Sequence, residues 1–424
     1  MNSVNKKQSP YSIFLQYSIF SSAFMTMVFT VNLIYFVTVI GLDPLQMVLV
    51  GTALELSIFL FEIPTGVVAD TISRRTSIII GVFLIGIGFV VQASFQSFVF
   101  ILIAQVIWGL GYTFTSGATQ AWITDEIGED QAGSAFLHAA QLEQVGALIA
   151  IGLSVLFSTI WSMRIPMLLG GLFFWILGFY LIIWMPENAF IRKSTSVKTS
   201  MEGFYQTVKA GWKTVRIHPI LWRILVIGFF FGFYSEGLDR LSVPHLIEKF
   251  NLPDLGEGTM VGWFGGLNAI GMVLTFFFAG LLRKYLGKQI PVIQLSRFLA
   301  LFSTGLVISL VIFPIANQML LSFSVLLLIG ILRSLIYPLY NAWINQNIPS
   351  EIRATIVSLS SLVDATGQIG GGPLVGVIAR QYSIQAGLLT SAFLLSPVLV
   401  LFAVLYRKKK DGGSSSLIFP NQSG

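Results

Sequence analysis

The chain has 424 residues, of which 55% are hydrophobic and only 10% are charged, and its formal net charge is +6 at pH 7. A soluble protein would carry about 25% charged residues, so the composition excludes a soluble enzyme, a disordered scaffold and a nucleic-acid-binding domain. There is no cysteine and there are only three scattered histidines, which excludes disulfides and cysteine-bound metal and argues against any metal site.

Long apolar runs fill most of the chain and predict membrane-spanning helices. About 20 mostly apolar residues in a helix cross the hydrocarbon core of a bilayer. The first run is too long for a cleavable signal and lacks a small-residue cleavage site. We therefore predict an all-α membrane protein with twelve spans, at residues 11–40, 44–69, 77–96, 98–122, 134–160, 164–185, 220–243, 258–282, 290–313, 318–343, 354–379 and 385–406.

Lys and Arg residues are distributed unequally between the two sides of these predicted spans. One side carries most of them, whereas the other carries only Arg164, Lys249 and Arg380. The basic side of a membrane protein faces the cytoplasm, and an even number of spans places both termini there. We expect a multi-pass protein of the cell membrane, in a bacterium the plasma membrane, with both ends cytoplasmic.

A polar, basic break separates the sixth span from the seventh and includes an amphipathic stretch from Met201 to Arg216. It predicts four regions along the chain. These are an N-terminal six-helix half (1–186), a cytoplasmic central loop (187–219), a C-terminal six-helix half (220–407) and a flexible tail (408–424).

The two halves can be compared at an offset of 221 residues. The run Ala121-Trp122-Ile123 then falls on Ala342-Trp343-Ile344, and Glu143 falls on Asp364. Gly146 likewise falls on Gly367. Paired repeats are typical of secondary transporters, so we predict two related six-helix halves.

The loop after the second span reads Gly66-Val-Val-Ala-Asp70-Thr-Ile-Ser-Arg74-Arg75. It resembles the signature of the major facilitator superfamily, which has Gly, three residues, Asp and a basic pair, with Ser73 here in place of the usual Gly. The resemblance covers the chain from Tyr11 to Tyr406. It implies two pseudo-symmetric six-helix bundles and a secondary transporter, not an enzyme, that needs no cofactor and uses an ion gradient.

A narrower resemblance begins upstream of that loop. The pattern Glu62-Ile-Pro64, Asp70 and Arg74-Arg75, with Glu55 one heptad before Glu62, is similar to clostridial-type tetracycline efflux and macrolide efflux members. It implies export of hydrophobic drugs by proton antiport with alternating access. The alternatives are a metabolite uptake symporter and a lipid flippase of the same fold.

Two features depart from the pattern of drug antiporters. Gln105 stands where proton-coupled antiporters often have Arg in the fourth span, and the Gly-Pro motif of the fifth span is missing. A Gly-Pro element, Gly370 to Pro373, appears in the eleventh span instead.

Glu55 and Glu62 lie two turns apart on one face of the second span. An ionised group at the centre of a span costs at least about 2.5–3.5 kcal/mol. One interpretation is a proton site, since a carboxylate of low-dielectric surroundings can bind and release protons near physiological pH. The other is a structural latch at the inner gate, which the position favours for Glu62 and leaves open for Glu55.

Glu143 and Asp364 occupy equivalent repeat positions, and Arg333 matches the depth of Asp364. An Arg333–Asp364 ion pair would remove the cost of either charge alone. Tyr112 occupies the position of Arg333 in the first half, so Glu143 has no equivalent cation. It is therefore the better candidate for a protonatable, substrate-linked group, unless it forms a hydrogen bond with Gln105 or Tyr112.

Glu236, Asp239 and Arg240 have i, i+3 and i+4 spacing near the outer end of the seventh span. Glu236 and Arg240 are well spaced for an ion pair. This outer cluster is expected to be an internal salt bridge or an outer gate, with a substrate site as the alternative.

Acidic residues on the cytoplasmic side have no basic neighbour in sequence. Asp125 and Glu126 face a loop that otherwise carries Glu129 and Asp130. We expect Arg74 and Arg75 to bind there, which predicts a cytoplasmic gate made by Gly66, Asp70, Arg74, Arg75, Asp125 and Glu126.

Spans one, four, seven and ten line the cavity in the resembling family. Their polar and aromatic residues suit a small amphipathic or aromatic substrate, moved with protons by a chain that acts as a monomer in the lipid bilayer. The expected cavity residues are Asn32, Gln105, Tyr112, Tyr337 and Asn341. Sequence motifs of hydrolases, metalloproteases and nucleotide-binding loops do not occur in the chain.

Overall fold

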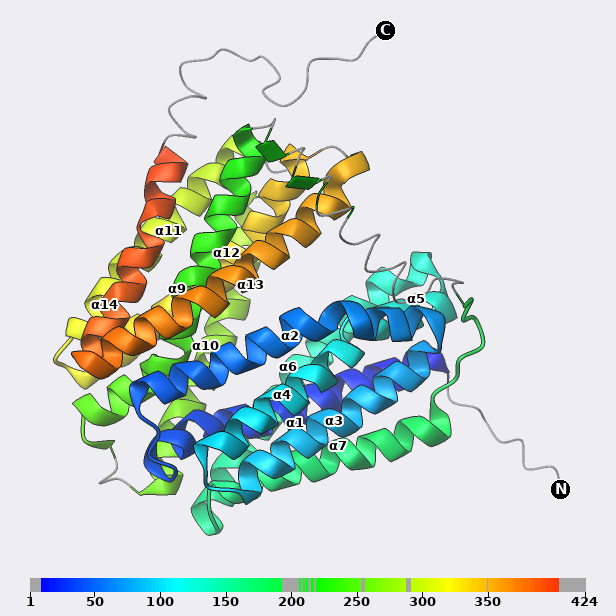
Figure 1. Ribbon diagram of the computed structural model, residues 1–424, viewed down its shortest axis with the longest axis horizontal. Helices are drawn as coiled ribbons and strands as arrows, with labels where there is room; N and C mark the ends of the chain where they lie inside the picture. The colour runs from blue at the N-terminus through cyan, green and yellow to red at the C-terminus, as the bar shows by residue number, and fades with distance from the viewer. Residues whose placement is uncertain are drawn as a thin grey trace, which may run out of the picture. The chain divides into compact units, whose positions relative to one another are not determined.

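The computed structural model describes residues 9–192, 206, 209, 211–212, 215–216, 219–252, 256–286, 291–348 and 350–403. These residues are helical throughout, with short connections and no strand in the described ranges (Figure 1). The helices are α1 (Pro10–Thr38), α2 (Pro44–Thr71), α3 (Arg74–Ser94), α4 (Phe98–Thr115), α5 (Ala118–Ile127), α6 (Glu129–Ile160), α7 (Arg164–Trp184), α9 (Pro219–Lys249), α10 (Glu257–Leu286), α11 (Val292–Ile315), α12 (Met319–Asn347), α13 (Ser350–Gln381) and α14 (Ile384–Leu395).

Eleven helical segments among the described residues are long and apolar enough to cross a membrane, with α4 and α5 counted together. The twelfth crossing is α13, which has 32 residues. At 1.5 Å per residue it is roughly 48 Å long, more than a bilayer core requires. Its hydropathy is lowered by a polar face that includes Ser360, Asp364 and Gln368. The predicted all-α fold with twelve spans is therefore confirmed.

Helix starts follow directly from local sequence. Asp43 accepts a hydrogen bond from the backbone N–H of Gln46, whose side chain bonds back to the Asp43 N–H, and Pro44 takes the first helical position of α2. Ser73 caps α3 by accepting from the Thr76 N–H. Such caps satisfy backbone donors that would otherwise be left without partners.

Glycines in the left-handed region break the fourth span and join it to the fifth. Gly117 has φ of 63° between α4 and α5, and Gly128 has φ of 87° between α5 and α6. Because one residue is enough for the second turn, Glu129 and Asp130 form the first turn of α6. The expectation of a loop there is wrong, since acidic side chains are favoured at a helix N-terminus.

The chain forms two compact units. The first is built around α1 and α3–α7, with α3 packed against both α4 and α7 (Figure 1). The second is built around α9 and α11–α14, with α9 packed against both α13 and α14. The limits of the four predicted regions stay predictions, and the tail 408–424 and most of the stretch Met201–Arg216 lie outside the described residues.

The predicted repeat reappears as matching helix contacts inside the two units. In the first unit, a Cβ placed on Gly146 of α6 would lie 2.7 Å from the carbonyl oxygen of Ile19 in α1. In the second, a Cβ placed on Gly367 of α13 would lie 2.4 Å from the carbonyl oxygen of Phe229 in α9. Small residues let membrane helices approach closely, so each glycine brings its helix against the first helix of its own unit.

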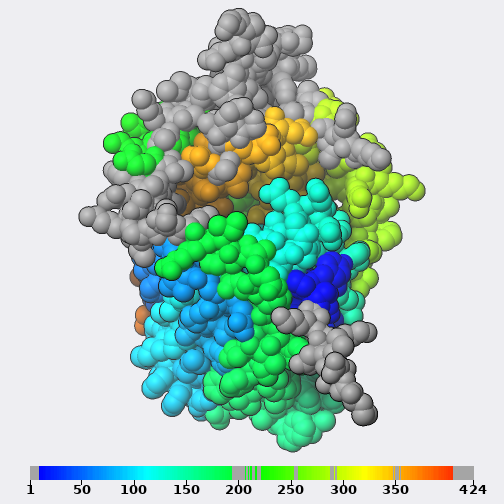
Figure 2. Space-filling view, turned by 90° about the vertical axis from the view of Figure 1, so that its right-hand side faces the viewer, coloured from blue at the N-terminus to red at the C-terminus, as the bar shows by residue number. Residues whose placement is uncertain are grey.

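Large apolar side chains cover the outside of the helices. In α10, Phe276 and Tyr285 are each 79% exposed, which is expected of side chains that face lipid. The start of α1 lies beside α6 on the surface shown in Figure 2, where Tyr11 Oη and His138 Nδ1 are 2.5 Å apart. The apolar exterior and polar caps together fit a protein whose solvent is a bilayer.

Candidate functional site

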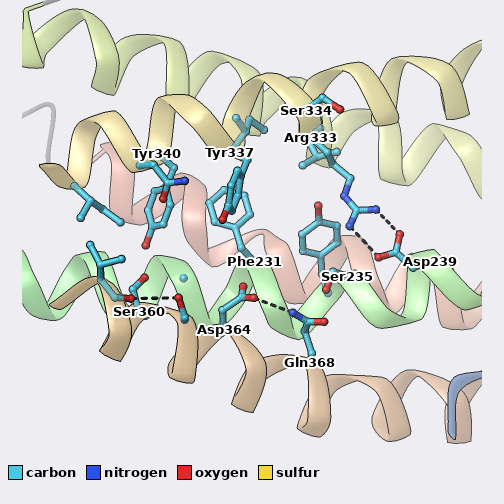
Figure 3. Close-up of a pocket in the computed structure, with 18 of the residues that line it drawn as sticks. Phe231, Ser235, Asp239, Arg333, Ser334, Tyr337, Tyr340, Ser360, Asp364 and Gln368 are labelled. Carbon is cyan, nitrogen blue, oxygen red and sulfur yellow. Dashed lines mark hydrogen bonds and ion pairs between the residues drawn. The ribbon is translucent and has the colours of Figure 1, made fainter. Parts of the chain in front are cut away.

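A cavity of about 720 Å³ lies within the second unit, among α9, α11, α12 and α13 (Figure 3). Its volume is that of a typical site for a drug-sized molecule. Aromatic rings, hydroxyls, amides and three charged groups line it together. The lining residues that carry them are Phe231, Tyr234, Ser235, Asp239, Arg333, Ser334, Tyr337, Tyr340, Asn341, Asn345, Ser360, Ser361, Asp364 and Gln368.

One end of this pocket is closed by an ion pair between α12 and α9. Arg333 donates two hydrogen bonds to Asp239, one from each terminal nitrogen, and the Nη2–Oδ2 distance is 2.9 Å. The ring of Tyr234 lies 5.8 Å from the guanidinium carbon. A bidentate pair of this kind is geometrically specific, and it engages both ends of the guanidinium fork.

The hypothesis of an Arg333–Asp364 ion pair is wrong. Depth in the membrane does place the two residues at similar levels, but the side of α12 that carries Arg333 also faces Asp239 of α9. The Asp364 carboxylate instead accepts a hydrogen bond of 2.8 Å from Gln368 Nε2, one turn along α13.

Close contact between α9 and α13 positions Asp364. A Cβ on Gly232 would lie 2.0 Å from the carbonyl oxygen of Asp364, and one on Gly371 would lie 1.9 Å from that of Phe233. Gly367 and Gly371 are four residues apart, the spacing of small residues at close helix interfaces. The glycines therefore bring the backbone of α13 against α9, and Asp364 points into the space occupied by Phe231 and Tyr337 (Figure 3).

Aromatic residues of α9 and α12 form the wall opposite Asp364. Tyr340 is buried and donates a hydrogen bond of 2.7 Å to the carbonyl oxygen of Ile224, and its ring meets that of Phe231 edge to face at 5.8 Å. Tyr337 is 70% exposed. Of the predicted cavity residues, Tyr337 and Asn341 line this pocket.

Two members of the outer cluster form the ion pair that their spacing predicts. Arg240 Nε lies 3.2 Å from Glu236 Oε2, and Glu236 is 4% exposed. Asp239, the third member, faces the pocket and binds Arg333 instead. The cluster thus comprises two neighbouring ion pairs, which balance one another's charge within the span.

Part of the predicted cytoplasmic gate comes together inside the first unit. Arg74 forms ion pairs with Asp125 of α5 and, at 3.8 Å, with Asp70 of α2. Arg75 does not reach this acidic group and donates to the carbonyl oxygen of Ile182 at 2.5 Å. The expectation that both arginines bind Asp125 and its neighbours is therefore correct for Arg74 alone.

Glu126 and Glu187 hold the residues that follow α7. Glu126 accepts hydrogen bonds from the backbone N–H groups of Asn188 and Ala189, at 2.5 and 3.0 Å. Glu187 accepts from Ser73 Oγ at 2.6 Å and from the Arg75 N–H at 2.9 Å, at the N-terminus of α3. Glu187 was not among the predicted site residues, and its only sequence signal is an acidic residue at the start of a basic loop.

The other predicted residues of the first unit do not gather into one site. Glu62 is exposed and Glu55 is half-buried on α2. Glu143 is half-buried, and its carboxylate has no hydrogen-bond partner among the described residues. Asn32 is 7% exposed in α1, whereas Tyr112 is 40% exposed in α4, as is consistent with no common pocket for the two.

Gln105 belongs to a buried hydrogen-bond network. It donates to Gln92 Oε1 at 2.9 Å and accepts from Trp108 Nε1 at 2.8 Å. With both ends of its amide engaged, Gln105 is a packing element between α3 and α4, and it does not bind Glu143.

Comparison with known proteins identifies the family. The model of the Major Facilitator Superfamily matches residues 17–371, more than half of the chain. The chain belongs to the Major Facilitator Superfamily. It is a multi-pass membrane transporter, and transporters of this superfamily are not enzymes and need no cofactor. In the described part of the chain, no group of three or more His, Asp or Glu side chains could hold a metal ion.

Relatives and solved structures of this superfamily match nearly the whole chain. It is 25% identical over 378 residues to the uncharacterized MFS-type transporter YxaM of Bacillus subtilis (strain 168), covering 87% of this chain and 90% of that one. The crystal structure of the nucleoside transporter NupG has a TM-score of 0.76 at 13% identity and covers 94% of this chain and 100% of its own. A bacterial homologue of the human lysosomal transporter Spinster has a TM-score of 0.74 at 14% identity, covering 98% of this chain and 100% of its own.

Proposed function

We propose that this superfamily member exports amphipathic, drug-sized molecules across the cell membrane by proton antiport with alternating access. The observation that carries the proposal is the pocket of about 720 Å³ within the second unit. Aromatic rings line it and can stack on flat, ring-containing solutes. Hydroxyl and amide groups between the rings can orient such a solute without requiring one fixed hydrogen-bond pattern.

Carboxylates in the spans supply the proton coupling in this proposal. Glu55 and Glu62 of α2, Glu143 of α6 and Asp364 of α13 are the candidates, with Arg333 biasing Asp364 through the field of its charge. A proton that enters down its gradient neutralises one of these groups and thereby changes the relative stability of the two orientations of the transporter. Its release to the cytoplasm restores the charge and completes the cycle.

The charged groups around Arg74 serve as the cytoplasmic gate in the same scheme. Gly66, Asp70, Arg74 and Asp125 lie at the ends of α2, α3 and α5, and the Arg74–Asp125 pair joins two of these helices. Arg75 and Glu126 act on it indirectly, by holding the backbone around residues 182–189. The outer cluster of Glu236, Asp239 and Arg240 is the equivalent element near the other end of α9. Both termini are cytoplasmic in this scheme, the membrane is the plasma membrane, and the chain works as a monomer.

Uptake of a polar metabolite is the second candidate function. The pocket carries many hydroxyl and amide groups for a site that binds apolar drugs, and these groups would suit a hydrogen-bonding solute. Similar folds occur in the nucleoside transporter NupG and in a peptide transporter of the POT family, which has a TM-score of 0.72 at 12% identity. Direction of transport separates this candidate from export.

A drug-susceptibility panel tests the proposal. Cells that express the chain are compared with cells that express Arg74→Ala, using tetracyclines, macrolides and cationic dyes, with and without an uncoupler. Export predicts that the native chain raises the inhibitory concentration of at least one compound and that the uncoupler removes the effect. Unchanged susceptibility to the whole panel, with the chain demonstrated in the membrane, would refute drug export, and a drug-independent gain in solute uptake would favour the second candidate.

A further inference from the structure

We propose that Asp364 is the recognition site for a positively charged group on the solute, and that the pocket selects ring-containing organic cations. This inference deepens the proposed function and depends on it only in treating the pocket as the solute site. Three features of the pocket lead to it: its charge balance, the position of the carboxylate and the chemistry of the opposite wall.

The charge balance of the pocket is negative. Its lining residues in the described part of the chain include one cation, Arg333, and two anions, Asp239 and Asp364. Arg333 and Asp239 bind each other through both terminal nitrogens of the guanidinium. Asp364 is left as the group whose charge no ion pair cancels, so a cation gains electrostatic energy in this pocket and an anion loses it.

Asp364 is placed to meet a ligand and is only partly satisfied by the protein. Gln368 donates to its Oδ2 atom at 2.8 Å, and a carboxylate can accept several more hydrogen bonds. The close approach of α13 to α9 at Gly232 holds its backbone in place. The side chain points into the space where Phe231 and Tyr337 lie (Figure 3), so its remaining acceptor capacity is directed at the pocket.

The opposite wall suits a cation that carries rings. Phe231, Tyr337 and Tyr340 offer π faces, and an organic cation between them and Asp364 gains cation–π attraction as well as the charge-assisted hydrogen bond. An inorganic cation would leave almost all of the 720 Å³ empty and would find two separated carboxylates, of which Asp239 is already bound to Arg333. The ligand class is therefore an aromatic amine in its protonated form, or a permanent aromatic cation.

Three probes with one naphthalene ring test this inference by binding alone. Purified chain in detergent is titrated with 1-naphthylmethylamine, 1-naphthalenemethanol and 1-naphthoate, which carry positive, zero and negative charge, and binding is followed by calorimetry. The native chain is expected to bind the amine at least about tenfold more tightly than the alcohol, and the naphthoate least tightly, since a charge-assisted hydrogen bond is the difference between the first two.

Asp364→Asn is expected to reduce affinity for the amine at least about tenfold while affinity for the alcohol stays within about threefold. Glu248→Gln is the matched control, because it replaces an exposed carboxylate at the end of α9, outside the pocket; it should leave all three affinities unchanged. Asp364→Glu should retain the preference for the amine. Melting temperatures of the variants establish that each is folded.

Equal affinity of native chain and Asp364→Asn for the amine would overturn the inference. So would a native preference for the alcohol or the naphthoate, or the absence of amine binding to the folded native chain. Tight binding of the amine without any proton-driven movement of it would instead refute the proposed antiport and leave the recognition site standing.

Discussion

The contact between α13 and α9 gives the sharpest prediction, because a single methyl group tests it. In Gly367→Ala, the new Cβ would lie 2.4 Å from the carbonyl oxygen of Phe229 and 2.9 Å from the backbone nitrogen of Phe233. Ordinary contact for a Cβ begins near 3.4 Å, so the two helices must separate locally by about 1 Å. Backbone atoms cannot rotate out of the way as a flexible side chain could.

The expected cost follows from two opposing effects. Overpacking of a close interface costs about 1–3 kcal/mol, whereas replacing Gly by Ala inside a helix contributes about 0.8–1.0 kcal/mol of stability. Gly367→Ala should therefore lower the free energy of unfolding by about 1–2 kcal/mol. Gly280→Ala in α10 is the matched control, because nothing lies within 4 Å of its new Cβ; it should keep or raise stability.

Thermal unfolding in detergent measures this difference. One kcal/mol corresponds to about 2–4 °C in the melting temperature of a domain of 150–250 residues, so the two variants should differ by about 4–8 °C. If Gly367→Ala melts at the same temperature as Gly280→Ala or above it, the close approach of α13 to α9 is not a determinant of stability, and the positioning of Asp364 by these glycines is wrong.

Three further predictions concern charged groups. Asp239→Asn leaves Arg333 without its counter-ion and should destabilise the chain by about 1–3 kcal/mol, because the pair is partly exposed; the double variant with Arg333→Gln should lose less than the two single variants together, as measured by thermal unfolding. Glu187→Gln weakens the charge-assisted hydrogen bonds at the start of α3 and should cost about 1–2 kcal/mol, with limited proteolysis after residue 187 as the check; unchanged cleavage would contradict it. Glu143→Gln should abolish pH-gradient-driven transport while solute binding persists if Glu143 carries the proton, whereas Glu62→Gln should reduce transport only if Glu62 does more than form a latch; pH-jump uptake assays distinguish these results.

The membrane-spanning architecture was predictable because few physical rules determine it. A bilayer requires long apolar helices, and the repeat follows from matched residues such as Trp122 and Trp343, each of which is 2% exposed. The pairing of Gly146 and Gly367 in the repeat also predicted equivalent surroundings, which both helices provide. Helix ends were predicted less well, since one Gly at position 128 was enough to turn the expected loop into the start of α6.

The partners of buried charges could not be predicted from position in the membrane. Glu236 and Arg240 share one helix, so their spacing determines the pair, and this prediction is confirmed. Arg333 has possible partners on two other helices, and which of them it binds depends on how each helix is rotated about its axis. Apolar faces of nearly uniform hydrophobicity give little information on that rotation, so Asp364 was expected where Asp239 lies. Glu187 was missed for a related reason, because it binds backbone groups that sequence patterns do not reveal.

Solute-driven proton movement tests the central claim, proton antiport through the Asp364 pocket, most directly. Purified chain is reconstituted in liposomes with a trapped pH-sensitive dye, an imposed pH gradient, and a membrane potential clamped by potassium and valinomycin, and ethidium is added on one side. The account predicts that ethidium discharges the gradient through the native chain and the Glu248→Gln control, but not through Asp364→Asn or in liposomes without protein. A gradient that ethidium leaves intact in the native chain, or discharges equally in Asp364→Asn, would contradict it.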